Sequence, residues 1–351
     1  MTFSAALRTL HDTAVAERVG ERTASRLNDV RVFVAHEMLE VEALIARHTN
    51  GRSNGSGVAG VPPATHAARH LSDAGGKRVR PMALLLAAAC FGPIDVRARE
   101  LAAAAELVHM ATLLHDDVVD DGDQRRGRPT SRRVWGNAVS VLAGDLLLVE
   151  ALRLAAHAHA ETWTELIDTL GLLVDGEVVQ LRGRLAVSLE ESTYFEIVRG
   201  KTASLFAWAL RAGARQGGGS RTAIDALGAF GDHLGVAFQL VDDVLDYAGD
   251  ANMTGKTVFA DLLEGKMTLP LLRAAAMDAT LPPLIARVRD GDVDTAVHIA
   301  ARVRALGACD ATRDMARSET AAALVRLEAV PSCAARDVLA DVARDLVARI
   351  C

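Results

Sequence analysis

Two stretches decide the fold class: AVSVLAGDLLLVEALRLAAHAHA at residues 138–160 and ELIDTLGLLVDGEVVQLRGRL at residues 165–185. Both are rich in Ala, Leu and Glu, and their apolar residues recur every three or four positions, which is the period of an amphipathic helix. They lie between Pro129 and Pro270, where no proline interrupts long helices. No convincing period-two pattern of a strand is present. The sequence therefore predicts an all-α protein.

Composition limits the kinds of partner. The chain has 351 residues, of which 50% are hydrophobic, so it can bury a sizeable core. Its net charge of -6 provides no general attraction to nucleic acid or anionic lipid, so an anionic ligand must be held by a local cluster of cations. No stretch reads as a signal peptide or a membrane span, and the four scattered cysteines form no CxxC pair. We expect a cytoplasmic protein that binds no nucleic acid.

The domain organisation follows from one break in the pattern. Residues 1–60 are expected to be a helical N-terminal extension that ends in a Gly/Ser-rich linker, NGRSNGSGVAG, at about residues 50–60. Residues 61–351 are expected to form one continuous helical domain, because helical patterning resumes at once on both sides of the loops at 217–220 and 249–255.

A short acidic motif, DDxxD, ends two apolar helical runs. Its aspartates are Asp116, Asp117 and Asp120 in the first copy and Asp242, Asp243 and Asp246 in the second. Aspartates four residues apart lie on one face of a helix and repel each other unless a cation lies between them. A solvated helix end is the usual explanation of one such triplet, but two copies after apolar runs favour a binding role. Carboxylates without His or Cys partners favour Mg²⁺, which is commonly shared with substrate phosphates.

Cations for such phosphates stand in two short clusters next to glycines. GGKRVRP places Lys77, Arg78 and Arg80 before a helix expected to start near Pro81, at the end where backbone N–H groups favour anions. DQRRGRPT places Arg125 and Arg126 one short loop after the first acidic motif. A solvated basic loop explains either cluster alone; their closeness to the aspartates favours diphosphate binding. Three further arginines are expected to be surface charges: Arg128, Arg132 and Arg133.

Taken together, these motifs resemble the trans-isoprenyl diphosphate synthases of the polyprenyl synthetase family, especially the octaprenyl and heptaprenyl types. The resemblance runs from about Gly75 to Leu272 and keeps the family's order: GGKRVRP, ELVHMATLLHDDVVDD, RRGRPT, a GD in SVLAGDLLL, GEVVQL, KT, AFQLVDDVLDY and GKTVFADLLEGKMTLPLL. It implies a large single-domain bundle of long helices around a central diphosphate-binding cavity. It also implies the head-to-tail, trans condensation of isopentenyl diphosphate with an allylic diphosphate.

The same resemblance assigns roles to residues. For isopentenyl diphosphate it implies Lys77, Arg80, His109 and Arg126. Around the allylic diphosphate, where the chemistry takes place, it implies Arg125, Lys201, Thr202, Gln239, Lys256 and Lys266. For magnesium it implies Asp116, Asp120 and Asp242 as direct ligands, with Asp117, Asp243 and Asp246 in support. One departure concerns Asp261, which follows Ala260 where the family often has paired aspartates, so Asp261 is given no role.

Product length and assembly are further expectations. Thr112 and Ala111, four and five residues before the first aspartate, are small, and Ala102 to Ala105 leave room deeper along the same helix. In the family, aromatic residues at the positions of Thr112 and Ala111 stop elongation early. We therefore expect a long product, hexaprenyl to decaprenyl diphosphate, for isoprenoid or quinone biosynthesis. We also expect a homodimer that contacts a membrane transiently to release its product.

Three other functions remain open from the sequence. A terpene cyclase also ionises a prenyl diphosphate at DDxxD, but it usually has a different second metal motif and lacks GGKRVRP. A non-catalytic partner subunit would keep the fold, yet such subunits typically lose aspartates or basic residues. A helical scaffold without a ligand leaves the paired motifs unexplained. Incubation with magnesium, isopentenyl diphosphate and an allylic primer separates these possibilities.

Overall fold

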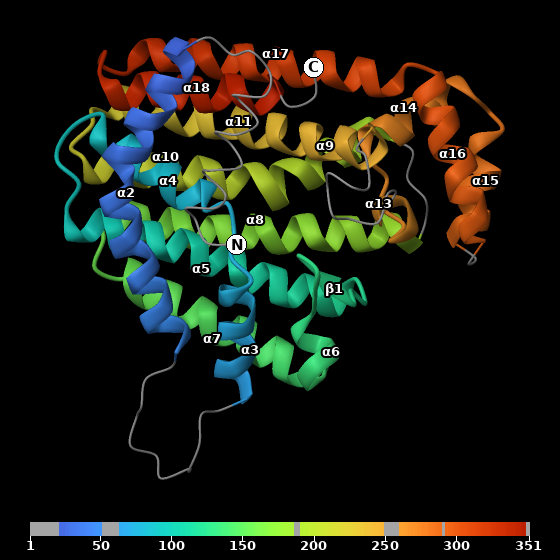
Figure 1. Cartoon of the computed structure of the whole chain (residues 1–351), viewed down its shortest axis with the longest axis horizontal. Helices are drawn as coiled ribbons and strands as arrows, with labels where there is room; N and C mark the ends of the chain where they lie inside the picture. Colours follow the sequence, from blue (N-terminus) through green and yellow to red (C-terminus); the bar gives the residue numbers. More distant parts are fainter. Residues whose placement is uncertain (1–20, 51–62, 186–189, 249–259, 290–291, 349–351) are drawn as a thin grey trace. The chain divides into compact units, whose positions relative to one another are not determined.

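The computed structural model describes residues 21–50, 63–185, 190–248, 260–289 and 292–348, and nearly all of its regular elements are helices (Figure 1). The all-α prediction is confirmed. The expected Gly/Ser linker and the loop at 249–255 lie outside the described residues. The chain divides into two units, and several helices contribute to both.

The first unit comprises residues 1–163, 209–224 and 331–339. Its elements are α2 (Glu21–Thr49), α3 (Pro63–Asp73), α4 (Val79–Ala89), α5 (Val96–Val119), β1 (Gln124–Arg125), β2 (Arg128–Pro129), α6 (Ser131–Trp135) and α7 (Asn137–Ala155). The second unit comprises residues 164–208, 225–330 and 340–351. Its elements are α9 (Glu191–Val198), the π-helical turn η1 (Arg199–Ala203), α13 (Ala260–Leu263), α14 (Leu269–Met277), α15 (Leu281–Arg289), α16 (Val293–Ala305), α17 (Ala308–Arg326) and η2 (Leu327–Ala329). Four helices are divided between the units: α8 (Ala160–Leu185), α10 (Ser204–Gln216), α11 (Arg221–Ala248) and α18 (Ala334–Ala348).

Helix α5 is the centre of the first unit. It packs most extensively against α7 and also against α4 and α2. Ala102 to Ala105 are fully buried, so small side chains on every side of this turn let neighbouring helices approach closely. Asp95 begins α5 by accepting a hydrogen bond from the backbone N–H of Ala98 at 2.8 Å. The first acidic motif lies at the C-terminal end of α5, so this packed helix fixes the position of its aspartates.

The N-terminal helix α2 belongs to the packing of this unit. Val34, Met38, Val41 and Ile45 recur on one helical face and are almost completely buried. This face explains the contacts of α2 with α3, α4 and α5. Whether a domain boundary lies near residue 60 stays a prediction, because residues 51–62 are not described.

A small β-hairpin departs from the expected helical pattern. Strands β1 and β2 pair antiparallel, with Gln124 opposite Pro129 and Arg125 opposite Arg128. The two turn residues, Arg126 and Gly127, have φ of 53° and 73°, and a type I′ turn needs positive φ at both places. Strands of two residues show no alternation in the sequence, which is why the pattern did not reveal them.

In the second unit, α11 carries the long apolar stripe. Phe230, Leu234, Ala237, Val241 and Val244 recur at intervals of three and four residues and are buried. The second acidic motif lies on the last turns of this helix. Helices α14 to α17 pack against one another, and α15 and α16 lie side by side in Figure 1. No helix in the described ranges is long and apolar enough to cross a membrane.

Candidate active site

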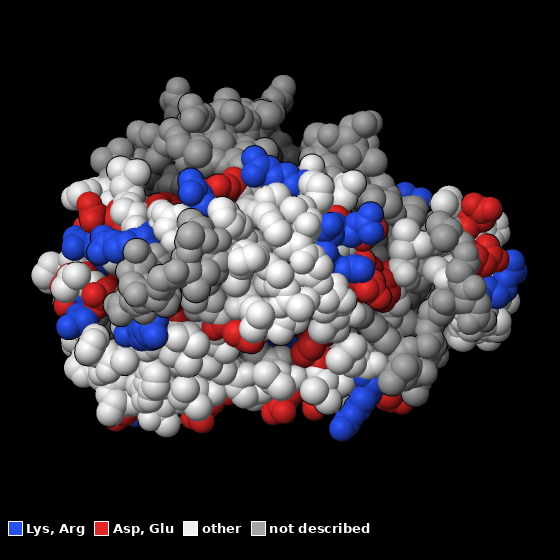
Figure 2. Space-filling model, turned by 90° about the horizontal axis from the view of Figure 1, so that it is seen from below, with Lys and Arg blue, Asp and Glu red and all other residues white. Residues whose placement is uncertain are grey.

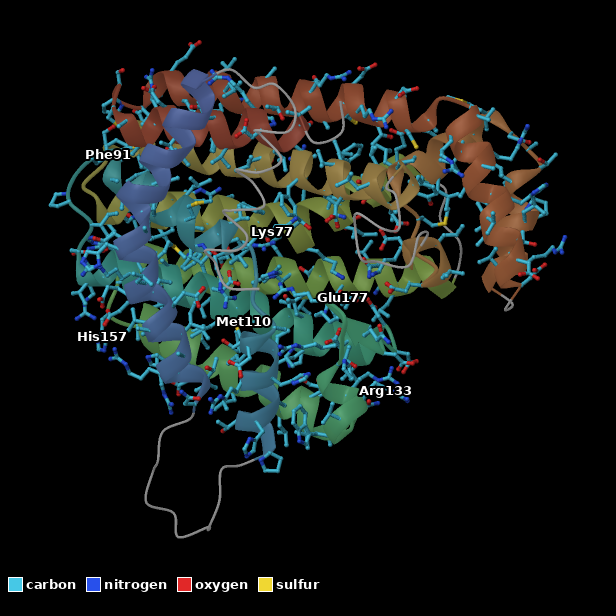
Figure 3. The ribbon with its side chains drawn as sticks, in the orientation of Figure 1. Lys77, Phe91, Met110, Arg133, His157 and Glu177 are labelled. Atoms are coloured by element: carbon cyan, nitrogen blue, oxygen red, sulfur yellow. The ribbon has the colours of Figure 1, made fainter. Side chains whose placement is uncertain are left out.

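The structure brings the two predicted basic clusters together in the first unit. A Cβ atom added to Gly76 would lie 3.2 Å from Nη1 of Arg126 and 3.2 Å from Nη1 of Arg78. The loop before α4 and the turn of the β-hairpin therefore meet at the backbone of Gly76. Lys77, labelled in Figure 3, is exposed on this loop. Convergence of cations from two loops is what a diphosphate site requires.

Arg78 differs from its neighbours in this loop. The sequence analysis grouped it with Lys77 and Arg80 as a cation for an anionic ligand. In the structure its guanidinium is buried and donates to Oε1 of Glu42 at 2.8 Å and to Oε1 of Glu106 at 2.7 Å. Burial lowers its pKa, but the two carboxylates more than offset this and raise it, so Arg78 stays charged. Its charge is satisfied inside the protein.

The rest of this cluster has an excess of positive charge in a partly desolvated place. Burial lowers the pKa of Arg80 to about 10 despite the attraction of Glu106. Burial, followed by the charges of Arg80, Arg126, Arg125 and Arg78, holds the pKa of His109 well below its usual value. His109 is therefore neutral at pH 7 and can donate an N–H bond without adding charge. Such an environment favours a bound anion.

On the face of the molecule seen in Figure 2, Lys and Arg side chains do not gather into one basic surface. The face seen in Figure 2 shows small groups of Lys and Arg beside Asp and Glu, separated by uncharged surface. Of the three arginines expected as surface charges, Arg128 and Arg133 are exposed. Arg132 is half-buried and pairs with Asp121 at 3.1 Å.

The first acidic motif is linked directly to the hairpin. Asp117 is buried, and its Oδ1 accepts hydrogen bonds from Nε of Arg125 at 2.9 Å and pairs with Nη2 of Arg125 at 2.8 Å. Asp116 and Asp120 are half-buried, four residues apart on the same helix end. Asp117 thus joins the basic hairpin to the end of α5, whereas its neighbours Asp116 and Asp120 are not buried.

In the second acidic motif, which lies in the second unit, the middle aspartate is again buried and the outer two are half-buried. Asp243 is buried and accepts hydrogen bonds from the hydroxyl of Tyr194 at 2.7 Å, Nε2 of Gln239 at 2.9 Å and the backbone N–H of Leu269 at 3.3 Å. Burial and then the charge of Asp261 raise the pKa of Asp243 to about 7, against these hydrogen bonds. Asp242 and Asp246 are half-buried. The middle aspartate of each motif is therefore held inside the protein.

The predicted Lys201 and Thr202 lie in the π-helical turn η1. This turn is held closely on two sides. A Cβ atom on Gly176 of α8 would lie 3.0 Å from Cγ of Lys201, and one on Gly235 of α11 would lie 2.4 Å from Cα of Ala203. Single π turns inside helices are frequent at functional sites. Only glycines allow α8 and α11 to approach this turn so closely.

Within the turn, both predicted side chains have partners. Lys201 pairs with Glu177 of α8, which is labelled in Figure 3. Thr202 of η1 donates from Oγ1 to Oε1 of Gln239 on α11 at 3.1 Å. The structure therefore brings Gln239 next to the turn that carries Lys201 and Thr202. The Glu177 carboxylate is therefore the counter-charge of Lys201 in this structure.

Two further predicted lysines, Lys256 and Lys266, belong to the last motif, GKTVFADLLEGKMTLPLL. Lys266 pairs with Glu264 at 2.5 Å and lies 3.8 Å from Asp261, which was given no role. Lys256 lies outside the described residues. All of these assignments to substrate and metal stay predictions.

The donor chemistry fits magnesium without a preformed cage. Over the described ranges, no three His, Cys, Asp or Glu side chains converge as a metal cage would need. Mg²⁺ is usually bound through one or two carboxylates, with waters and substrate phosphates completing its shell. Pairs of half-buried aspartates, such as Asp116 with Asp120, suit this mode.

Three site residues were missed from the sequence. Glu106 is the buried counter-charge of the basic cluster, and its signal was a lone acid inside the apolar run LAAAAELVHM. Tyr194 and Glu177 hold Asp243 and Lys201, and neither could be distinguished from ordinary helix residues by spacing alone.

Comparison with known proteins gives a consistent result. Residues 62–299 match the sequence profile of the family described as Polyprenyl synthetase. The all-trans-nonaprenyl-diphosphate synthase (geranyl-diphosphate specific) of Rhodobacter capsulatus is 39% identical over 297 residues, which cover 80% of this chain and 88% of that protein.

Solved structures agree with the sequence match. The crystal structure of a decaprenyl diphosphate synthase from Rhodobacter capsulatus has a TM-score of 0.84 and 36% identity, covering 92% of this chain and 99% of that one. A polyprenyl synthase from Caulobacter crescentus, solved with calcium and isoprenyl diphosphate, has a TM-score of 0.84 and 35% identity, covering 92% and 98%.

Proposed function

The chain belongs to the polyprenyl synthetase family, and on that premise we propose that it is a magnesium-dependent trans-polyprenyl diphosphate synthase. It condenses isopentenyl diphosphate with an allylic diphosphate, head to tail, to give a long-chain product between hexaprenyl and decaprenyl diphosphate. The observation that carries the proposal is the meeting of two basic loops at Gly76, beside an α5 helix that ends in paired aspartates. Relatives named nonaprenyl and decaprenyl diphosphate synthase support the long product.

Isopentenyl diphosphate would be bound by the basic cluster of the first unit. Lys77, Arg80 and Arg126 would neutralise the diphosphate, and the neutral His109 would donate a hydrogen bond to it. The partial burial of Arg80 strengthens its attraction to the anion, because less water screens the charge. The substrate would thereby be held with its double bond free to react.

The allylic diphosphate would be bound by Arg125, Lys201 and Lys266 as it leaves. Mg²⁺ bound by the aspartates would supply additional positive charge on the leaving diphosphate. Thr202 and Gln239 would offer dipoles to the allylic carbocation once its carbon–oxygen bond breaks. The isopentenyl double bond then forms the new carbon–carbon bond, and the proton lost from that unit passes to the departing pyrophosphate, because no site side chain in the described part of the chain is an obvious base.

The assay that tests this function contains purified protein, Mg²⁺, labelled isopentenyl diphosphate and farnesyl diphosphate as the allylic primer. We expect label in a long polyprenyl diphosphate, with none formed when EDTA is added or the primer is left out. A terpene cyclase would release hydrocarbon from the primer without consuming isopentenyl diphosphate. A non-catalytic subunit would form no product alone. Either result would overturn the proposal.

Assembly and location complete the proposal. We expect a homodimer, because Val141, Leu142 and Val149 leave apolar side chains exposed on α7. We also expect the enzyme to work in the cytoplasm and to touch a membrane only while a hydrophobic product leaves. Co-flotation with liposomes during turnover, and its absence without substrates, would test that contact.

A further inference from the structure

We propose that Glu42, Arg78 and Glu106 are positioning residues that fix the loop for isopentenyl diphosphate, and that Glu42 reaches it from α2. The inference rests on the proposed function and concerns how its first substrate is held. Glu42 precedes residues 62–299, which match the family, so this contribution comes from outside the matched region.

The three side chains form a closed network. Arg78 uses its whole guanidinium: Nε donates to Oε1 of Glu42 at 2.8 Å, Nη2 to Oε2 of Glu42 at 3.3 Å, and Nη1 to Oε1 of Glu106 at 2.7 Å. The pair with Glu42 is therefore two-pronged, which fixes the plane of the guanidinium as well as its distance. The side chains of Arg78 and Glu106 are each only 3% exposed, so water hardly weakens this contact, whereas the side chain of Glu42 is 32% exposed.

The backbone of the loop needs such an anchor. Arg78 has φ of 50° and ψ of 37°, a left-handed conformation that costs about 1 kcal/mol or more in a residue with a Cβ atom. The residue stands at the N-cap of α4 without a side-chain cap hydrogen bond. The network therefore holds the backbone in this conformation. Lys77 and Arg80, the proposed substrate ligands, lie on either side of it, so their direction depends on the same conformation.

The anchor is carried by a firmly packed helix. Val34, Met38, Val41 and Ile45 bury the face of α2 that carries it into the first unit, and Glu42 follows directly after the buried Val41. This packing fixes the backbone that carries Glu42, and two hydrogen bonds from Arg78 hold its carboxylate.

The network also distinguishes Arg78, whose charge is neutralised inside the protein, from Arg80 and Arg126, which we propose bind the substrate. Arg78 is neutralised by two carboxylates, whereas for Arg80 and Arg126 the attraction of Glu106 does not offset burial, and the pKa of each stays below its usual value. Without Glu42, the guanidinium of Arg78 would lose one partner and gain freedom to move toward Arg126, whose Nη1 lies against the same Gly76. The site would then be both less ordered and more repulsive internally.

The test compares Glu42→Gln with the control Glu37→Gln. Glu37 also lies on α2 and pairs with Arg99 of α5, whose Nη2 donates to it at 3.1 Å, so both variants remove one α2 carboxylate from an ion pair. Only Glu42 touches the loop. In Glu42→Gln we expect the KM for isopentenyl diphosphate to rise about tenfold, from loss of a charge-assisted hydrogen bond. The KM for farnesyl diphosphate should change by less than about twofold.

Glu37→Gln should leave both KM values within about twofold of wild type, with a melting temperature lowered as much as in Glu42→Gln. Arg78→Lys, which keeps the charge but loses the two-pronged geometry, should also raise the KM for isopentenyl diphosphate selectively. An active wild type whose Glu42→Gln and Arg78→Lys variants keep a normal KM for isopentenyl diphosphate would overturn the inference. Equal rises in both KM values, or the same rise in Glu37→Gln, would also overturn it. A wild type that incorporates no isopentenyl diphosphate would instead overturn the proposed function.

Discussion

The aspartates of each acidic motif differ in burial. The middle aspartates, Asp117 and Asp243, are buried in hydrogen bonds, while the outer ones are half-buried. We predict that Asp116→Asn and Asp242→Asn each lower kcat by at least about 100-fold, because an amide binds Mg²⁺ far more weakly than a carboxylate. The helical circular dichroism should not change.

The control for this pair is Asp121→Asn. Asp121 directly follows the first motif, its side chain is 83% exposed, and asparagine tolerates its left-handed φ of 52°. Its kcat should stay within about twofold of wild type. Near-normal turnover of Asp116→Asn or Asp242→Asn in magnesium would show that the metal assignment is wrong at that position.

A second residue-scale prediction concerns acid stability. Hydrogen bonds from Thr280 and Arg302 lower the pKa of Asp278 to about 2. Because the folded pKa is below the unfolded value of about 3.9, the stabilisation is complete above that value and is lost as pH falls toward about 2. Thermal melts of wild type and Asp278→Asn should therefore differ at pH 7 and converge near pH 2. For Asp314→Asn, at an exposed pair with Arg317, we expect little difference at either pH.

At this scale the sequence predicted residue types but not their individual roles. The closeness of Lys77, Arg80 and Arg126 to an acidic motif led to the prediction of a diphosphate-binding cluster, and the structure brings the two basic loops together at Gly76. It could not separate Arg78 from Arg80, because the partners of Arg78 lie 36 and 28 residues away and are brought near only by the packing of α2 and α5 on α4.

Among the elements, the π-helical turn depends on close approach. We predict that Gly235→Ala lowers both stability, by about 1–3 kcal/mol, and turnover, because its methyl group would lie 2.4 Å from Cα of Ala203 and displace the turn that carries Lys201. The matched control is Gly171→Ala on α8, where nothing lies within 4 Å of the added Cβ. That variant should be neutral or more stable by up to about 1 kcal/mol. Urea unfolding and initial rates of both variants would decide this, and equal effects would contradict the packing argument.

Helix α5 is also the element expected to set product length. We predict that Ala111→Tyr shortens the product, since a phenol beside the first motif would block the growing prenyl tail. Ala111 is only 2% exposed, so the substitution must displace neighbours and should lower stability by about 1–3 kcal/mol as well. Product analysis by mass spectrometry checks it. Unshortened products from a folded variant, or a wild type that stops at geranylgeranyl diphosphate, would refute the idea.

The long helices were predictable because their burial repeats along the sequence, as in α11. The π turn and the β-hairpin were not, for a physical reason. The turn forms where Gly176 and Gly235 let two helices close on it, and the hairpin is set by two positive φ angles at Arg126 and Gly127. Both depend on local geometry and tertiary contact, which leave no periodic pattern.

For the whole molecule, we predict that two chains assemble into a homodimer. Val141, Leu142 and Val149 are 38%, 59% and 43% exposed along α7, and Leu142 and Val149, seven residues apart, lie on the same face of that helix. We predict light scattering at micromolar concentration to give twice the mass of one chain, and Leu142→Glu to shift it toward the single-chain mass. A wild-type protein with the mass of one chain would exclude the homodimer.

The packing of α2 has a practical consequence for work on related chains. A gene fragment cut at residue 62, where the family match begins, would remove the buried residues from Val34 to Ile45 and leave their partners on α4 and α5 in contact with water. Such a fragment would contain every recognised motif and would still be prone to aggregate during expression. Sequence families are delimited by what relatives share, whereas a folding unit is delimited by what it must bury.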